Sequence, residues 1–333
     1  MSGFLPGIVG LEDAREQLRR MVVGDRVPTG LLLHGAAGRG KRTLALALAR
    51  ALLCGDATGE VDPTSACASK VDGSGHPDLE SVTRDEDQRR IGIDKVRQLK
   101  DRFSLTPAEA PRRVAIVVDA ERLTEEAGNA LLKLLEEPPP RSHLILTGRA
   151  KDSVMETLVS RCRHLRVPAL APHEVAAFLQ SRDIDPARAH RLSLIAEGRP
   201  GFALSLAGDD FETRVLAPAQ RLLHSSAEPW GVAEAVAATV REGAQKAEGA
   251  RENLRIVFDA VTWFLRAALR HAVGSQTGQE SLELLDPATR EALAGHAPQV
   301  LEGRLESVLA ARSDLDRNIA LEAILGPLAT SFG

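Results

Sequence analysis

The sequence predicts an α/β fold built on a parallel sheet, followed by a long region that is all helical. Three observations lead to this prediction. Short apolar runs such as "GLLLHG" (30–35) and "RVAIVVDA" (113–120) alternate with helical patterns, and continuous apolar strands are typical of a sheet covered on both faces. A glycine turn joins the first run to a helix. After about residue 211 no strand pattern recurs, and amphipathic helices continue.

The predicted elements follow one another in the order of a parallel α/β sheet. The strand at 30–35 precedes a helix over "KRTLALALARALLC" (41–54). The strand at 113–120 precedes a helix that begins after Thr124, has two glutamates in its first turn and ends before three prolines. "SHLILTG" (142–148) is the third strand. Such sheets bind ligands beyond the carboxyl ends of their strands.

The composition is that of an ordinary globular protein and excludes several classes of function. The chain has 333 residues, 44% hydrophobic and 26% charged, which is enough for two or three domains. A net charge of -4 and the lack of tyrosine argue against a freestanding nucleic-acid binder and against a stacking platform for single strands. No signal peptide and no apolar run of about 18 residues is found, so we expect a cytoplasmic protein without membrane partners.

The loop after the first strand has the spacing of a phosphate-binding loop. Backbone N–H groups and a lysine bind phosphates in such loops, and the matching residues are Gly35, Gly38, Gly40 and Lys41. The next residue is Arg42, where the pattern needs a hydroxyl group for magnesium, and a cation cannot ligate the metal. Thr43 does not replace that hydroxyl, because one step along a helix turns the side chain by about 100°. The sequence therefore predicts a degenerate nucleotide site.

The second strand ends in a carboxylate without its usual neighbour. Asp119 stands where a magnesium-organising aspartate belongs, and it is equally well interpreted as a polar strand end. An ATPase of this type has a water-activating glutamate next, but this chain has Ala120. Glu121, one position further on, is expected to point elsewhere. Loss of both the metal ligand and the base predicts a large loss of transition-state stabilisation.

Five segments together resemble the AAA+ clamp-loader subunits of bacterial DNA polymerase III. They are "GLLLHGAAGRGKRTLALALARALLC", "IGIDKVRQLKDRFSLTP", "VVDAERLTEEAGNALLKLLEEPP", "LVSRCRHLRV" and "GRPGFALSLA". The resemblance covers residues 4–207, and "RNIALEAILGPLA" is also similar to the last helix of that family. It implies an AAA+ module at 1–167, a small helical lid at 168–210 and an α-helical collar, which joins subunits, at 211–333.

The resemblance also implies a role for the motif Ser160-Arg161-Cys162. In clamp loaders this motif supplies an arginine finger to the nucleotide of a neighbouring subunit, where a planar, permanently charged cation neutralises phosphoryl charge. Without the family, Arg161 is one of several surface arginines. Cys162 is then a small packing residue.

Further departures concern the residues that contact the chain's own nucleotide. The lid motif Gly-Ser-x-Arg of the family's ATPases has its arginine at a position that is Gly201 here, with Arg199 displaced by two. Thr147 is the candidate polar sensor at the end of the third strand, with Gly148 and Arg149 as alternative alignments. The parts that act on the chain's own nucleotide are altered, whereas the finger motif is intact. This asymmetry favours the delta-prime type of subunit over the ATP-hydrolysing gamma/tau type.

Residues 55–78 form an inserted loop that resembles a degraded zinc module. The family has four cysteines here, whereas this chain keeps only Cys54 and Cys67. A structural zinc site needs four nitrogen or sulfur ligands, and His76 brings the set only to three. We therefore expect no zinc, with Cys54 as a plain core residue. The three cysteines of the chain fit a reducing compartment and offer no disulfide framework.

The resemblance implies a structural subunit of the replicative clamp loader that requires no cofactor and hydrolyses no ATP itself. Such a subunit works in a hetero-pentamer with gamma/tau ATPases and a delta subunit, which places a sliding clamp on primed DNA. It belongs to the DNA polymerase III holoenzyme, so polymerase activity is its own only by association. Two alternatives stay open: a gamma/tau-type or other replication AAA+ ATPase, and a subunit that binds ATP without turnover, unless Arg42 fills the phosphate pocket.

Overall fold

The computed structural model of the chain divides into two compact units. One unit comprises residues 1–182 and 197–202, and the other comprises residues 183–196 and 203–333. Residues 168–210, assigned to a single lid in the sequence analysis, are thus shared between the two units. The residues that the structure describes are 3–73, 75–85, 88, 90–208, 210–224, 228–242, 247–315, 317 and 319–332.

The first unit is built on a parallel sheet of five strands in the described residues. The strands are β2 (Gly30–His34), β4 (Leu79–Val82), β5 (Arg113–Val117), β6 (Ser142–Gly148) and β7 (Arg163–Arg166). Their order is β4-β5-β6-β2-β7, and every neighbouring pair is parallel. The chain leaves β2 for the far edge, returns through β5 and β6, and ends at β7 on the other side of β2. The strand order therefore reverses at β2, which is where α/β sheets bind ligands.

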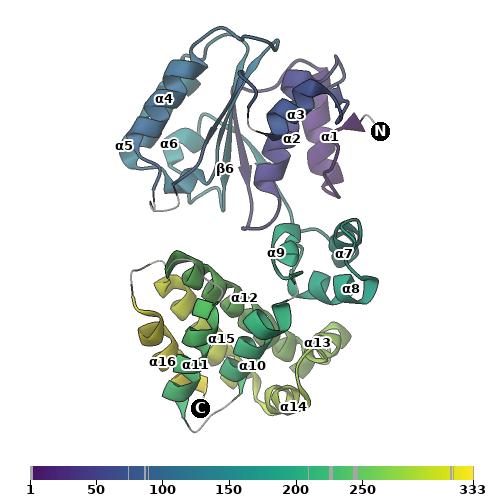
Figure 1. The fold of residues 1–333 in the computed structure, drawn as a ribbon, viewed down its shortest axis with the longest axis vertical. Helices are drawn as coiled ribbons and strands as arrows, with labels where there is room; N and C mark the ends of the chain where they lie inside the picture. Colours follow the sequence, from purple (N-terminus) through teal and green to yellow (C-terminus); the bar gives the residue numbers. More distant parts are fainter. Residues whose placement is uncertain are drawn as a thin grey trace. The chain divides into compact units, whose positions relative to one another are not determined.

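Helices cover both faces of this sheet (Figure 1). One face carries α1 (Glu12–Val23), α2 (Lys41–Cys54) and α3 (Ala66–Asp72), and the other carries α4 (Ile93–Phe103), α5 (Glu125–Glu136) and α6 (Glu156–Val159). The central strands are apolar throughout because neither face meets water; Leu31, Leu32 and Leu33 of β2 are at most 1% exposed. The predicted parallel α/β sheet is confirmed.

The predicted elements agree in type with the structure, although one strand is shorter than expected. The strand over 113–120 ends at Val117, and Asp119 has a φ of 56°, in the left-handed region that cannot continue a strand. Thr124 is the N-cap of α5, and its hydroxyl oxygen accepts a hydrogen bond from Ala127 N–H at 3.2 Å. The edge strands β4 and β7 were not predicted, because four residues are too few for a clear apolar pattern.

The second unit is helical in all the elements that the structure describes. Its longest helix is α12 (Ala247–Ala272), which buries Phe258, Trp263 and Phe264. The helices packed against α12 are α10 (Ala217–Leu223), α11 (Pro229–Glu242), α13 (Gln276–Leu282), α14 (Pro287–Gly295) and α15 (Pro298–Asp314). The predicted helical second half is confirmed. Among the described residues, no helix combines the length and the apolar character that a membrane span requires.

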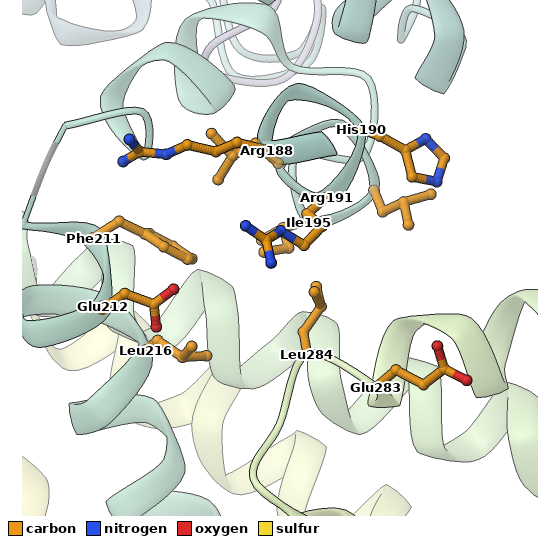
Figure 2. Close-up of a pocket in the computed structure, with 11 residues that line it drawn as sticks. Arg188, His190, Arg191, Ile195, Phe211, Glu212, Leu216, Glu283 and Leu284 are labelled. Carbon is orange, nitrogen blue, oxygen red and sulfur yellow. The ribbon is translucent and has the colours of Figure 1, made fainter. Parts of the chain in front are cut away.

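A cavity of about 630 Å³ lies within the second unit (Figure 2). Arg188 and Arg191 of α8 (Pro186–Ile195) line one side of it, and Phe211 and Leu284 line other parts of the wall. The lining combines apolar side chains with charges of both signs, since glutamates contribute as well.

Three predictions about the insert at 55–78 and its cysteines are wrong. The segment is not a plain loop, because it contains β3 (Glu60–Val61), which pairs with β1 (Gly3–Phe4), and the helix α3. In addition, Cys54 and Cys67 form a disulfide, so the expectations of no disulfide and of Cys54 as a plain core residue both fail. The reason is tertiary: α3 packs back on α2 and brings the two Cα atoms to 5.7 Å, a distance that sequence spacing does not reveal.

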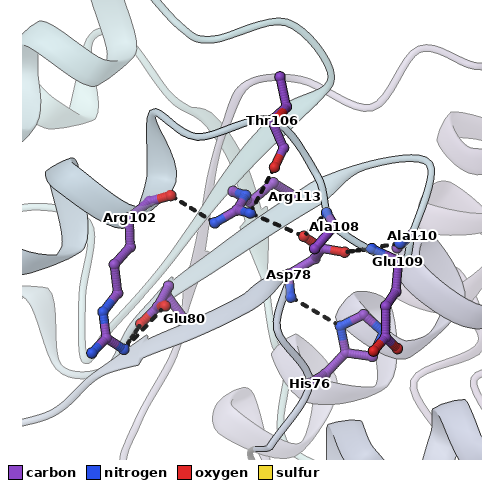
Figure 3. Close-up of polar contacts among 9 residues, drawn as sticks. All are labelled: His76, Asp78, Glu80, Arg102, Thr106, Ala108, Glu109, Ala110 and Arg113. Carbon is purple, nitrogen blue, oxygen red and sulfur yellow. Dashed lines mark hydrogen bonds and ion pairs between the residues drawn. The ribbon is translucent and has the colours of Figure 1, made fainter.

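A buried ion pair fastens the end of the insert to the sheet (Figure 3). The carboxylate of Asp78 is 0% exposed and accepts hydrogen bonds from the backbone N–H groups of residues 108–110 at 2.7–2.8 Å. Arg113 Nη2 donates to the same carboxylate at 3.1 Å, and the guanidinium also reaches the carbonyl oxygens of Arg102 and Thr106. Burial acts to raise the pKa of Asp78, but the backbone hydrogen bonds and Arg113 outweigh it, so the pKa lies below its ordinary value.

The disulfide predicts how many cysteines react in each state of the protein. Burial raises the pKa of the Cys162 thiol to about 12, so this residue is not a thiolate at pH 8. We expect iodoacetamide to label almost no cysteine in the native protein, only Cys162 after unfolding without reductant, and all three after unfolding with reductant. Mass spectrometry of the labelled protein measures this. Three labels in the unreduced, unfolded protein would show that Cys54 and Cys67 are not linked.

Asp78→Asn is expected to lower the free energy of unfolding by about 3 kcal/mol or more at neutral pH, because it leaves Arg113 as an unpaired buried charge. The folded-state pKa of Asp78 is lowered, so its stabilisation is present above the ordinary carboxyl pKa and is lost as the pH falls through the folded-state pKa. In urea titrations, the difference in the free energy of unfolding between the wild type and the variant should therefore become smaller as the pH falls. The control Asp94→Asn, which breaks an exposed pair with Arg97, should cost less than about 1 kcal/mol. Equal losses of unfolding free energy in the two variants would show that the Asp78–Arg113 pair is no more important for stability than an exposed pair.

Candidate functional site

The carboxyl ends of β2, β5 and β6 meet at one edge of the sheet. Parallel pairing places His34 opposite Gly148, and Gly35 N–H donates to Gly148 O at 3.1 Å. Asp119 N–H donates to Thr147 Oγ1 at 3.0 Å. The structure therefore brings together the phosphate loop, the strand-end aspartate and the candidate sensor, which lie far apart in the sequence.

The phosphate loop has a backbone shape that its glycines permit. Gly38 and Gly40 both have a φ of 78°, in the left-handed region that favours glycine. The helix α2 begins at Lys41, directly after the loop. The strand, glycine turn and helix predicted for this segment are therefore present, and the helix N-terminus lies where an anion site is usual in such folds.

Lys41 is bound by the loop itself. Its Nζ donates to the carbonyl oxygens of Gly35 at 2.7 Å and of Ala36 at 2.9 Å. Burial of the side chain, which is 7% exposed, lowers the pKa of the ammonium group, although Asp119 and Glu121 act in the opposite direction. Two of the three ammonium N–H donors are thus directed at neutral carbonyl groups of the same loop.

Residues 199–202 pack directly on the phosphate loop. Gly201 N–H donates to Gly38 O at 2.9 Å. A Cβ atom on Gly38 would lie 3.2 Å from Phe202 N and 3.3 Å from Arg199 Cβ, so the two segments are in close contact. The Arg199 guanidinium lies 4.1 Å from the centroid of the Phe202 ring. At the position where the family's ATPases have an arginine, this chain therefore makes a backbone contact with the loop.

Glu121 differs from the expectation that it points away from this edge. A 3-10 turn, η1 (Ala120–Arg122), follows Asp119 and turns the chain back toward β6. Glu121 Oε1 lies 3.6 Å from Arg149 Nε, and its Oε2 would lie 3.5 Å from a Cβ atom on Gly148. The carboxylate is therefore close to the sheet edge but is paired with a cation.

The residues of this edge do not match the ligand set of a magnesium nucleotide. Arg42 and Thr43 are exposed on the first turn of α2, and the arginine offers no oxygen ligand at the position that needs one. Ala120 is buried and offers no carboxylate for activating water. We therefore derive no hydrolytic step at this edge.

The cysteine pair does not match a structural zinc site. The sulfur atoms of Cys54 and Cys67 and a ring nitrogen of His76 lie within 4.8 Å of one another, but sulfurs joined in a disulfide are not thiolate ligands. His76 is buried, which lowers the pKa of its imidazole, and its Nδ1 accepts a hydrogen bond from Asp78 N–H at 3.1 Å. His76 thus belongs to the polar cluster around Asp78.

The motif Ser160-Arg161-Cys162 lies at the opposite edge of the sheet from the phosphate loop. It follows α6 and leads into β7, and a Cβ atom on Gly30 at the start of β2 would lie 2.9 Å from Cys162 Sγ and 3.3 Å from Arg161 O. Cys162 is buried in the core between the sheet and α5. Because Cys162 is fixed in the core, it anchors the neighbouring Arg161 at the surface.

The Arg161 guanidinium is bonded to three groups of its own chain. Its Nη1 donates to Thr157 O at 3.1 Å and to Ser160 Oγ at 3.4 Å. Its Nη2 forms an ion pair with Glu136 Oε1 at 2.6 Å. No sequence motif indicates a role for Glu136. The available signal was a carboxylate in the last turn of a helix, where the helix dipole disfavours negative charge.

Comparison with known proteins finds relatives for the first unit. Residues 10–171 match the family model described as "DNA polymerase III, delta subunit". DNA polymerase III subunit delta' of Escherichia coli (strain K12) is 32% identical over 188 residues, which cover 55% of this chain and 56% of that one. The same subunit of Bacillus subtilis (strain 168) is 30% identical over 171 residues, 51% of each chain. Subunit gamma/tau of Mycobacterium tuberculosis (strain ATCC 25618 / H37Rv) is 31% identical over 52% of this chain and 30% of that one. The chain thus spans about half the length of the delta' relatives.

Proposed function

We propose, from the match of residues 10–171 to the DNA polymerase III delta-subunit family and from the similarity to delta' subunits, that the chain is a delta-prime-type clamp-loader subunit that hydrolyses no ATP itself. In this role it supports the ring of subunits and presents Arg161 to the nucleotide of a neighbouring gamma/tau-type ATPase. The observation that carries the proposal is a contrast between the two edges of one sheet. The finger motif is complete and its arginine is at the surface, whereas positions 42 and 120 lack the groups that hydrolysis needs.

Four features in and around the phosphate loop support a site that does not hydrolyse ATP. Lys41 already donates to two loop carbonyls, and Gly201 occupies Gly38 O with a backbone hydrogen bond. Arg42 replaces the hydroxyl that would bind magnesium, and Ala120 replaces the base. We infer that the loop is retained because the fold needs its strand–turn–helix connection, and that no cofactor is required.

The surroundings of Arg161 support a role in trans. An arginine keeps its charge at every physiological pH and presents a planar set of donors to a phosphoryl group. Arg161 is 39% exposed, so a neighbouring subunit can reach it, while Cys162 and the bonds to Thr157 and Ser160 limit its freedom. The proposed partners are the gamma/tau and delta subunits, with the sliding clamp and primed DNA contacted through the assembled ring.

The purified chain is expected to turn over no ATP above background with magnesium, because position 42 offers no oxygen ligand and position 120 offers no base. Phosphate release and isothermal titration calorimetry measure turnover and binding. The Arg42→Thr/Ala120→Glu double variant, which restores both groups, is the comparison. Binding without turnover would indicate a structural subunit that binds ATP but does not hydrolyse it. Turnover that Lys41→Ala abolishes would favour the gamma/tau-type alternative.

Arg161→Ala should leave folding and ring assembly intact and reduce hydrolysis at the neighbouring site by about a hundredfold or more, because a finger arginine stabilises the transition-state charge. Single-turnover ATP hydrolysis and clamp loading are measured on a clamp loader reconstituted with the gamma/tau and delta subunits of the same organism. Arg163→Ala is the matched control, since it removes an exposed arginine two residues away. Wild-type rates for both variants would show that the finger assignment is wrong.

A further inference from the structure

Glu136 holds the arginine of the finger motif within its own subunit. The 2.6 Å ion pair joins Arg161 Nη2 to Glu136 Oε1, and the two side chains are 39% and 47% exposed. The bonds to Thr157 O and Ser160 Oγ use Nη1, the other terminal nitrogen. One terminal nitrogen is therefore held by oxygens of neighbouring residues on the same turn, and the other by a carboxylate from a different helix.

Glu136 does not stabilise its own helix. Glu136 is the last residue of α5, and Glu137 follows as the C-cap, so two negative charges lie at the negative end of the helix dipole. An exposed ion pair adds little stability, because water and salt screen it. What Glu136 does provide is a defined orientation for one guanidinium, that of Arg161.

We propose that Glu136 is a positioning residue that keeps Arg161 in a resting orientation until a phosphoryl group of the neighbouring nucleotide replaces it at Nη2. This inference rests on the proposed function. A carboxylate and a phosphoryl group compete for the same cation, because both accept charge-assisted hydrogen bonds from a guanidinium. The phosphoryl group carries more negative charge and wins once the two subunits close. Before closure, Glu136 restrains the finger.

Replacement of Glu136 by a phosphoryl group requires only Nη2 of the Arg161 guanidinium to change its partner. The bonds from Nη1 to Thr157 O and Ser160 Oγ lie on the turn that carries Arg161 itself, so they can persist while Nη2 changes partner. The exposure of the pair means that the incoming group can approach without unfolding any part of the subunit. Glu136 thus acts through Arg161 and sets how readily the neighbouring site hydrolyses ATP before the ring closes on DNA.

The test is Glu136→Gln, which keeps the shape of the side chain and removes its charge. In a clamp loader reconstituted with the gamma/tau and delta subunits, ATP turnover without DNA is expected to rise about two- to fivefold, the range that an exposed ion pair supports. The gain should be in kcat rather than KM and should shrink at high salt, which screens the pair in the wild type. Glu137→Gln removes the same charge one residue away and should have wild-type rates. An unchanged or lower rate for Glu136→Gln would overturn the proposal.

Further measurements separate this proposal from the proposed function. If Arg161→Ala slows hydrolysis and Glu136→Gln has no effect, only the role of Glu136 is wrong. If Arg161→Ala has no effect, the finger assignment fails and the role of Glu136 fails with it. The double variant should have the rate of Arg161→Ala, and a further change in rate would show that Glu136 does not act through Arg161. The melting temperature of the isolated Glu136→Gln chain should be unchanged or slightly raised, whereas a purely structural ion pair would lower it.

Discussion

The parallel pairing of β2 with β6 and β7 is the constraint on which both edges of the sheet depend. The pairing with β6 aligns the end of β2 with Gly148 and so brings the phosphate loop to Asp119 and Thr147. The pairing with β7 fixes the start of β2 against Cys162 and Arg161. Because parallel strands keep all their carboxyl ends at one edge, a residue that precedes a strand and one that follows a strand must lie at opposite edges. One sheet therefore presents a phosphate loop at one end and an arginine at the other.

Lys41 at one edge and Arg161 at the other are bound by different kinds of acceptor. Lys41 is buried and donates to carbonyl oxygens of its own loop, which are fixed parts of the backbone. Arg161 is exposed and pairs with a carboxylate on a separate helix. Burial keeps the Lys41 ammonium group against these carbonyl oxygens, whereas an exposed carboxylate can be exchanged at little cost. Lys41 therefore stays hydrogen-bonded within its own loop, whereas Arg161 can take a new partner.

The insert between α2 and β4 is held by covalent and ionic links rather than by a large core of its own. The disulfide joins α3 to the end of α2, and the Asp78–Arg113 pair fastens the segment to the start of β5. His76 lies between them, close to the sulfur atoms and hydrogen-bonded to Asp78 N–H. Both links therefore lie close to the same short stretch of chain around His76. The disulfide lies at the C-terminal end of α2, and the ion pair lies at the start of β4 and β5.

The elements that could be predicted from the amino-acid sequence are those whose signals are local. The apolar runs gave the central strands, Thr124 and the prolines bounded α5, and the glycine spacing located the phosphate loop, because each pattern reflects contacts between residues that are close in the chain. The substitutions at positions 42 and 120 were likewise visible without a structure. Which distant groups meet could be learned only from the fold: Cys54 with Cys67, Gly201 with Gly38, Glu121 with Arg149, and Glu136 with Arg161. These contacts depend on how helices pack on the sheet and on the left-handed turn at Asp119, and neither leaves a periodic signal in the sequence.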